Sequence, residues 1–494
     1  MKTYADWKAP KSDEAHFLWP AAGELLEQTR TNTEQLDSLD SILIQNMPLT
    51  DLRRATRGAI GLDLRPVIGT GHQIEMYHPG VWVKNIVIDE VAKQVGGRAI
   101  HVAVDTDTPK HLQLKWPDHS HLMSDDPQII EGAWSSLVAA PSPGHLDRIE
   151  RVFDHDAKDW AFKPAIHPFF AGFRASQADT LGESILTGAK ALDETLGLDV
   201  SFVTASRLIA TDGYLAFLHH VASDIERFAK HYNAALAAYR KEAGITTDSR
   251  PMPDLKVTDA MIELPFWLDD LDLQQRTRAV VVKIDGGWAL AGAADDPFVF
   301  DPDLDAPEAI GALRGYLKEH RLRLSPRALT LTMFMRLLLV DQFTHGIGGA
   351  RYDQVTDRII HTYFAVDPPA FSVATATLYF PGSGERLSAC IPCLMSEGHH
   401  LRHNVLPTKQ TYLETINRLP RKSLERRASY VEMHRALAKS AGATDTMPQW
   451  KNRLQSAIAR QDAEKTLFDR ELFYGIQPRE RLTSMIERYR IAFQ

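Results

Sequence analysis

The chain is poor in cysteine, in long apolar runs and in surplus positive charge, and each shortage excludes a class of protein. Two cysteines in 494 residues cannot form a disulfide framework, which indicates a reducing, cytoplasmic compartment. The most apolar stretch, 329–340, contains Arg336 and is shorter than the roughly 20 apolar residues of a membrane helix, so we expect a buried helix and no membrane partner. The net charge of -8 argues against a nonspecific nucleic-acid binder, which needs a surplus of lysine and arginine.

The composition is otherwise typical of a globular protein with several structural units. Hydrophobic residues at 44% and charged residues at 24% allow a large buried core. We expect the N-terminal region, up to about residue 60, to be helical. The sequence then predicts a strand over 66–69, a turn at 70–73, a helix over 81–95 and a strand over 99–104. The order strand, loop, helix, strand builds a parallel sheet.

Polar side chains follow both predicted strands. Gly71, His72 and Gln73 come after the first strand, and Asp105 and Asp107 come after the second. In parallel sheets the ligand crevice lies beyond the carboxyl ends of the strands, so we expect these residues to share one site.

Each candidate residue also has a structural explanation. Lys84, one turn into the predicted helix, could hold a phosphate or carboxylate with the helix amides, or could be a solvated surface lysine. His72 and His78 could exchange protons near neutral pH, although either alone is more often structural. Asp105 and Asp107 could orient an amine, bind a divalent ion or act as a base, and capping explains them equally well. We take the two histidines and the two aspartates as candidate catalytic residues.

Later segments predict more helices, a β-hairpin and a glycine-rich turn. The hairpin is indicated by an Asp-Gly pair, which tolerates the positive φ angles of a tight turn. The C-terminal part is strongly charged and favours a helical hairpin. These elements are helices from 184 to 244, the β-hairpin of 278–284 with 288–291, an apolar helix 328–340, the turn 344–349, and helices 411–441 and 448–472.

The order and spacing of four short blocks resemble the bacillithiol synthase family from about residue 65 to the end. A Gly-His-Gln triplet with a downstream His-Pro-Gly and a lysine is similar to that family's early block. The strand that ends in Asp105-Thr106-Asp107 resembles its acidic cluster, here without the histidine between the acids. The four blocks are residues 71–84, residues 105–107, residues 325–329 with 347–349, and residues 472–481.

The resemblance implies both a fold and an activity. The fold is a Rossmann-like parallel-sheet core with an inserted connecting region and a C-terminal antiparallel helical coiled coil that makes a homodimer. With the predicted small β-hairpin element, the expected class is α/β. The activity is a ligase that joins cysteine to glucosaminyl malate, a small anionic sugar conjugate, with an adenine nucleotide as candidate cofactor. Substrate binding would fall to Gly71, Gln73, Lys84, Gly348, Gly349, Arg351 and Tyr352.

The expected domain organisation has four parts. Residues 1–160 hold the N-terminal helices and the first part of the core, and residues 161–325 form a connecting helical region with the small β element. Residues 326–410 return to the core and contain a Cys/His cluster. Residues 411–494 form the coiled-coil hairpin and a C-terminal segment.

The Cys/His cluster has the ligand types of a zinc site. Cys390 and Cys393 are separated by two residues, and His399 and His403 lie four apart on an expected helix. Two thiolates and two imidazoles satisfy the tetrahedral preference of Zn²⁺. The spacing matches no standard zinc finger, however, and a buried cysteine pair beside a polar histidine turn is the alternative.

Three functions are therefore open at the level of sequence. The leading hypothesis is a bacillithiol synthase-like ligase. The first alternative is a nucleotide-dependent transferase of the same fold with a different acceptor. The second is a catalytically inert, zinc-stabilised dimeric interaction protein.

Overall fold

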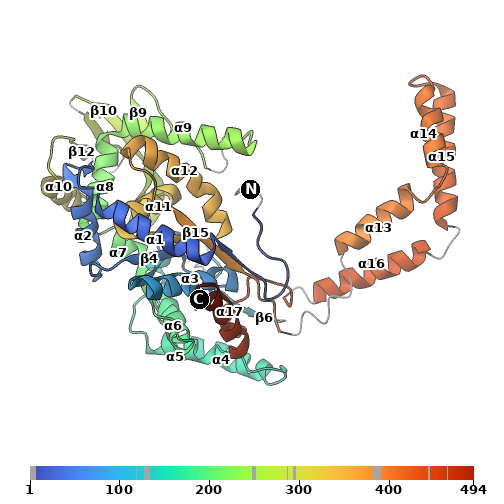
Figure 1. Cartoon of the computed structure of the whole chain (residues 1–494), viewed down its shortest axis with the longest axis horizontal. Helices are drawn as coiled ribbons and strands as arrows, with labels where there is room; N and C mark the ends of the chain where they lie inside the picture. Colours follow the sequence, from blue (N-terminus) through green and yellow to red (C-terminus); the bar gives the residue numbers. More distant parts are fainter. Residues whose placement is uncertain are drawn as a thin grey trace. The chain divides into compact units, whose positions relative to one another are not determined.

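The computed structural model shows a mixed α/β protein with two compact units, which are described separately (Figure 1). We call residues 1–115, 119–378 and 470–494 the core unit, and residues 116–118 and 379–469 the helical unit. The described residues are 7–108, 110–117, 119–126, 134–247, 252–285, 287–292, 296–381, 391–442, 446–463 and 466–494.

The core unit is built on a six-stranded sheet in the order β1-β15-β14-β4-β5-β8. All strands but β1 run parallel, and β1 pairs with β15 in the antiparallel direction at one edge. The chain lays down β4, β5 and β8 towards one edge and later β14 and β15 towards the other, so the strand order reverses between β4 and β14. The strands are β1 (His16–Trp19), β4 (Val67–Gln73), β5 (Arg98–Val104), β8 (Val200–Thr204), β14 (Gln342–His345) and β15 (Phe371–Ala376).

Strand β4, helix α3 (Pro79–Val95) and strand β5 confirm the predicted strand–helix–strand unit and the parallel sheet. Helix α3 is buried on nearly every side because it packs against β4, β5 and β15. It begins after His78, whose Nδ1 accepts a hydrogen bond from the amide of Gly80, and ends at the left-handed Gly96. The turn predicted at 70–73 is wrong, because these residues continue β4 and pair in register with 101–104 of β5.

Helix α12 (Ile347–Phe364) contacts β14 and β15, and Figure 1 shows α12 and α3 on opposite sides of the sheet. Right-handed crossovers require this arrangement, because the steps from β4 to β5 and from β14 to β15 run in opposite directions across the sheet. A large apolar core packs around Val67, Ile100, Phe217 and Leu337.

A second, five-stranded antiparallel sheet follows in the order β12-β11-β10-β9-β13. The predicted hairpin is confirmed in β10 and β11, and β9, β12 and β13 extend it into a sheet. Its strands are β9 (Met261–Asp270), β10 (Gln275–Ile284), β11 (Gly287–Leu290), β12 (Val299–Phe300) and β13 (Leu322–Pro326).

Two predictions of continuous helix are wrong. The N-terminal region contains β1, β2 and β3 as well as helices, and the region 184–244 is interrupted by β8. Strand β8 forms because its backbone pairs with β5 at the edge of the sheet, a long-range contact that outweighs local composition. The other elements, all in the core unit except for Trp116 at the end of β6, are α1 (Ala22–Asp37), β2 (Leu43–Ile44), β3 (Met47–Pro48), α2 (Leu49–Ala59), β6 (Gln113–Trp116), β7 (His119–Leu122), α4 (Pro143–Ala157), α5 (His167–Ala175), α6 (Leu181–Thr195), α7 (Ala205–Leu208), α8 (Asp212–Ser223), α9 (Ile225–Ala243), α10 (Ala306–Glu319) and α17 (Arg479–Ala492).

The most apolar segment forms the buried helix α11 (Ala328–Phe334), and a π-helical turn (Met335–Leu339) follows it. The prediction of a buried helix is confirmed. None of the described helices has both the length and the apolar character that are needed to cross a bilayer.

The helical unit contains α13 (Ile391–His403), α14 (Lys409–Arg418), α15 (Leu424–Gly442) and α16 (Thr446–Ala463). The predicted single helix 411–441 is wrong, because the chain breaks between α14 and α15 in a segment that contains Pro420. The predicted helix 448–472 is also too long at its C-terminal end. Helix α13 packs on α16 around Leu394 and Trp450, and α14 packs on α15 around Ile416 and Met433.

Candidate functional site

A cavity of about 610 Å³, which we call the strand-end cavity, lies beyond the carboxyl ends of β4, β5 and β14. Gly71, His72 and Gln73 line it from β4, Asp107 lines it after β5, and His345 lines it at the end of β14. The strand order reverses between β4 and β14, and in open α/β sheets ligands bind in the crevice at such a point.

Three arginines line the cavity from other elements. Arg276 and Arg278 come from β10, and Arg327 immediately precedes α11. Arg327 Nη1 donates to Glu263 Oε1 at 2.5 Å, and Arg278 Nη1 lies 3.2 Å from Glu263 Oε2. Because one carboxylate serves two guanidinium groups, the pair retains positive charge beside the cavity.

Arg276 links the second sheet to the polar turn after β5. Its Nη1 donates to Asp107 Oδ1 at 2.9 Å, and its Nε donates to the buried Asp269 at 2.6 Å. The guanidinium also lies 5.6 Å from the ring centre of Trp267. These contacts fix the guanidinium in one orientation at the cavity wall.

His345 and Asp353 form a hydrogen-bonded pair on the other side of the cavity. His345 Nε2 lies 2.8 Å from Asp353 Oδ2, and Arg336 binds the same carboxylate at 2.5 Å. Burial alone would raise the pKa of Asp353, but Arg336 and His345 lower it to about 2. In the neutral tautomer that donates from Nε2 to this carboxylate, Nδ1 is a hydrogen-bond acceptor. A Cβ at Gly349 would lie 2.9 Å from Nδ1, so a side chain there would crowd the ring.

Lys84 is buried behind β4 and is not among the residues that line the cavity. Its Nζ donates to the carbonyl oxygen of Gly71 at 2.9 Å. Burial lowers the pKa of Lys84 to about 7, against the opposing effect of Glu75. Burial also raises the pKa of Glu75 to about 7. His72 Nδ1 lies 3.3 Å from Glu75 Oε1, and burial lowers the pKa of His72.

The two polar segments predicted to meet lie together, because Gln73 Nε2 at the end of β4 donates to Asp107 Oδ2 at 2.8 Å. Asp105 makes a different contact. Its Oδ1 accepts a hydrogen bond of 2.8 Å from the backbone amide of Ser206, and this bond anchors the start of α7. Burial raises the pKa of Asp105, and the bonds from Ser206 oppose that rise. Of the residues proposed from sequence, Gly71, His72, Gln73, Asp107, Gly349 and Tyr352 line the cavity, and His78, Lys84, Asp105, Gly348 and Arg351 do not.

The remaining proposed residues have other surroundings. His78 caps α3, and burial lowers its pKa to about 3. Arg351 donates to the carbonyl oxygen of Trp7. Cys390 and the side chain of Cys393 lie outside the described residues, while the rings of His399 and His403 are 4.7 Å apart on α13.

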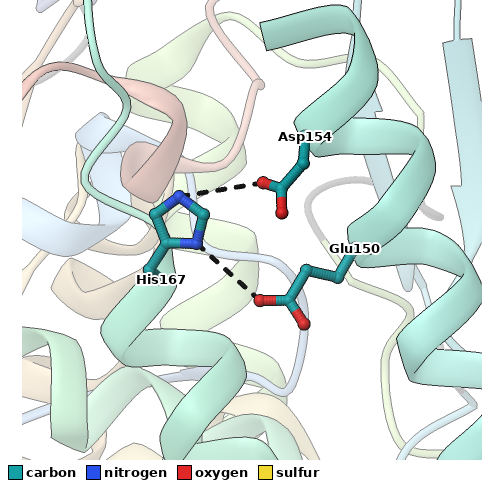
Figure 2. Close-up of side chains that lie close together, drawn as sticks. All are labelled: Glu150, Asp154 and His167. Carbon is teal, nitrogen blue, oxygen red and sulfur yellow. Dashed lines mark ion pairs between the residues drawn. The ribbon is translucent and has the colours of Figure 1, made fainter. Parts of the chain in front are cut away.

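A separate cluster, which the sequence did not suggest, contains three groups of metal-binding type. Glu150 and Asp154 lie one turn apart on α4, and His167 begins α5 (Figure 2). His167 Nδ1 is 3.7 Å from Glu150 Oε1, and Nε2 is 3.7 Å from Asp154 Oδ1. Arg174 also pairs with Glu150, so a cation already neutralises part of this cluster.

Sequence reasoning found Gly349 and Tyr352 of α12, but it missed the cavity residues that come from the second sheet, and it missed His345 and Asp353. The pattern Arg276-x-Arg278 within a strand puts both arginines on one face, and this spacing was a readable signal. His345 ends β14 and Asp353 lies eight residues later on α12, and only the fold brings them together. Compared with known proteins, the chain matches neither a family model nor a curated sequence.

Proposed function

We propose that the chain is an enzyme that binds a small anionic substrate in the strand-end cavity. The observation that carries the proposal is the convergence of Arg276, Arg278 and Arg327 on this cavity. Guanidinium groups present planar pairs of donors that match carboxylates and phosphates, and carboxylates of the protein already hold all three at fixed positions. A substrate anion would accept further hydrogen bonds from these guanidinium groups.

The strand order supports a Rossmann-like core as part of this proposal. Numbered by their order in the chain, the parallel strands read 3-2-1-4-5 from β8 to β15. The doubly wound dinucleotide-binding fold uses this order and binds its ligand where the order reverses. The cavity lies at the equivalent point of this sheet.

The proposed reaction is that of a bacillithiol synthase-like ligase, which joins an amino acid of the cysteine type to a small anionic sugar conjugate. Joining an amine to an acyl carbon releases a proton from the attacking nitrogen. His345 supplies an acceptor for that proton at Nδ1, because Asp353 holds the ring proton on Nε2. The arginines would orient the anionic part of the conjugate while the amine approaches His345.

An adenine nucleotide is the cofactor that fits this proposal. Gly346 is the N-cap of α12 after the end of β14, Gly348 and Gly349 lie in the first turn of this helix, and amides at a helix N-terminus favour phosphate. A Cβ at Gly348 would meet no atom within 4 Å, so this turn has room beside it. When bound, a nucleotide would supply a phosphate leaving group that activates a carboxylate.

Titration calorimetry with the purified chain tests the proposal. Glucosaminyl malate should bind, and Arg278→Met should weaken binding at least tenfold, because loss of one charge-assisted hydrogen bond costs about 1.5–3 kcal/mol. Glu263 keeps Arg327 as a partner in this variant, so folding should survive. Arg65→Met, an exposed arginine that pairs with Asp63, is the matched control.

The same titrations separate the alternatives. Binding of ATP or CTP without cysteine would favour a nucleotide-dependent transferase with another acceptor. If cysteine, glucosaminyl malate and both nucleotides all fail to bind, the specific substrate proposal is wrong. Zinc in the purified protein, together with those failures, would favour an inert zinc-stabilised interaction protein.

The proposal includes a homodimer formed through the helical unit and a cytoplasmic location. Leu424 and Val431 lie seven residues apart on α15, Ile458 lies on α16, and all three are exposed. Such side chains suit a helix–helix interface between two copies. The two cysteines of the chain suit a reducing compartment.

A further inference from the structure

A second cavity of about 370 Å³ lies in the core unit among α7, α8, α10 and β13. Its wall is mainly aliphatic and includes Leu215, Leu317, Leu322 and Leu324. Small-molecule pockets are mostly apolar with a few placed polar groups, and they span roughly 300 to 1,000 Å³. This cavity is at the small end of that range, so it suits a compact ligand with an apolar part.

The polar side chains around the second cavity are mostly cationic. Arg314, Lys318, Arg321 and Arg323 line it, and no carboxylate does so among the described residues. Arg314 and Arg321 form ion pairs with aspartates that are more than half exposed, where water screens the pairing. Lys318 lies on the exposed side of α10 and has no ion-pair partner in the described part of the chain.

Arg323 supplies a donor that the protein leaves unused. Its Nε donates to Asp269 at 3.0 Å, and its Nη1 lies 3.2 Å from Ser136 Oγ. Its Nη2 is buried and has no hydrogen-bond partner among the described residues. A buried charged donor without a partner is costly, and an anion in the adjacent cavity would remove that cost.

We propose that the second cavity is a binding site for a small amphipathic anion, a carboxylate or phosphate monoester with a short alkyl chain. The alkyl chain packs against the leucine-lined wall, and the head group accepts hydrogen bonds from Nη2 of Arg323 and from the ammonium group of Lys318. The apolar wall disfavours a polar anion such as inorganic phosphate, and the cations disfavour an alkylamine. The site is independent of the function proposed for the strand-end cavity.

Calorimetric titration of the full chain with octanoate, octyl phosphate and octylamine tests this site. Octanoate or octyl phosphate should bind saturably, and the better of the two identifies the head group. Octylamine should bind at least tenfold more weakly than the better anion. Failure of both anions to bind, or equal binding of octylamine, would overturn the proposal.

Matched variants locate the bound anion. Ala210→Trp adds bulk at an exposed lining residue, and Lys318→Glu reverses a charge at the rim, so each should weaken anion binding at least tenfold. Ala171→Trp and Lys256→Glu make the same changes at exposed positions elsewhere and should bind like the unaltered chain. Arg278→Met, in the strand-end cavity, should also bind normally. Unchanged binding in Ala210→Trp, or weakened binding in Arg278→Met, would refute the assignment to the second cavity.

Discussion

Replacement of the buried Lys84 by methionine should change how the stability of the core unit depends on pH. Lys84 is 2% exposed, and burial lowers its pKa from 10.5 to about 7 in the folded protein. Between these values the unfolded chain carries a proton that the folded chain has released. The free energy of unfolding therefore rises with pH in this window, by about 1.36 kcal/mol for each pH unit.

The free energy of unfolding should rise by roughly 2.7 kcal/mol between pH 7.5 and 9.5. This range lies above the folded pKa of Lys84 and below its unfolded pKa. Lys84→Met has no amine to titrate, so this rise should be absent.

Urea unfolding followed by tryptophan fluorescence measures the effect at pH 7.5, 8.5 and 9.5. Of the nine tryptophans, only Trp116 and Trp450 belong to the helical unit, so the signal reports mainly on the core unit. Lys93→Met is the control, because this lysine lies on the same helix with its side chain 45% exposed. Parallel pH profiles for Lys84→Met and the unaltered chain would refute a neutral, buried amine at position 84.

Two further substitutions test the packing of each unit. Asp341→Ala removes a fully buried carboxylate that pairs with two arginines of α2 at 2.6 and 2.8 Å, and urea unfolding should reveal a loss of about 3–5 kcal/mol. Asp212→Ala breaks an exposed ion pair and should cost under about 1 kcal/mol, so equal losses in the two variants would contradict the buried network. Gly398→Ala would bring a Cβ within 2.0 Å of the Trp450 ring and should destabilise the helical unit by about 1–3 kcal/mol, despite a gain of about 1 kcal/mol in helix propensity. Faster hydrogen exchange in α13 and α16 alone is the expected result, and unchanged exchange would show that the indole can move aside.

The local sequence pattern was enough to predict an element where that element buries a periodic apolar face. The valines at spacing four in α3 and the double glycine after it predicted the helix and its end. The apolar run of β5 predicted a strand, and the Asp-Gly pair in the sequence predicted the hairpin that β10 and β11 form. The pattern failed at β8, where pairing with a distant strand decides the conformation, and at the break between α14 and α15.

Sequence by itself determined that a parallel strand–helix–strand unit exists and that polar residues lie at the carboxyl ends of its strands, because strand and helix periodicity are local properties. Only the tertiary structure decided which polar groups share a cavity. Gln73 and Asp107 meet there because neighbouring parallel strands end at one edge, whereas Lys84 and Asp105 are drawn into bonds with Gly71 and Ser206. Arg276 and Arg278 come to the cavity from an antiparallel sheet more than 160 residues further along the chain, and no spacing in the sequence encodes that approach.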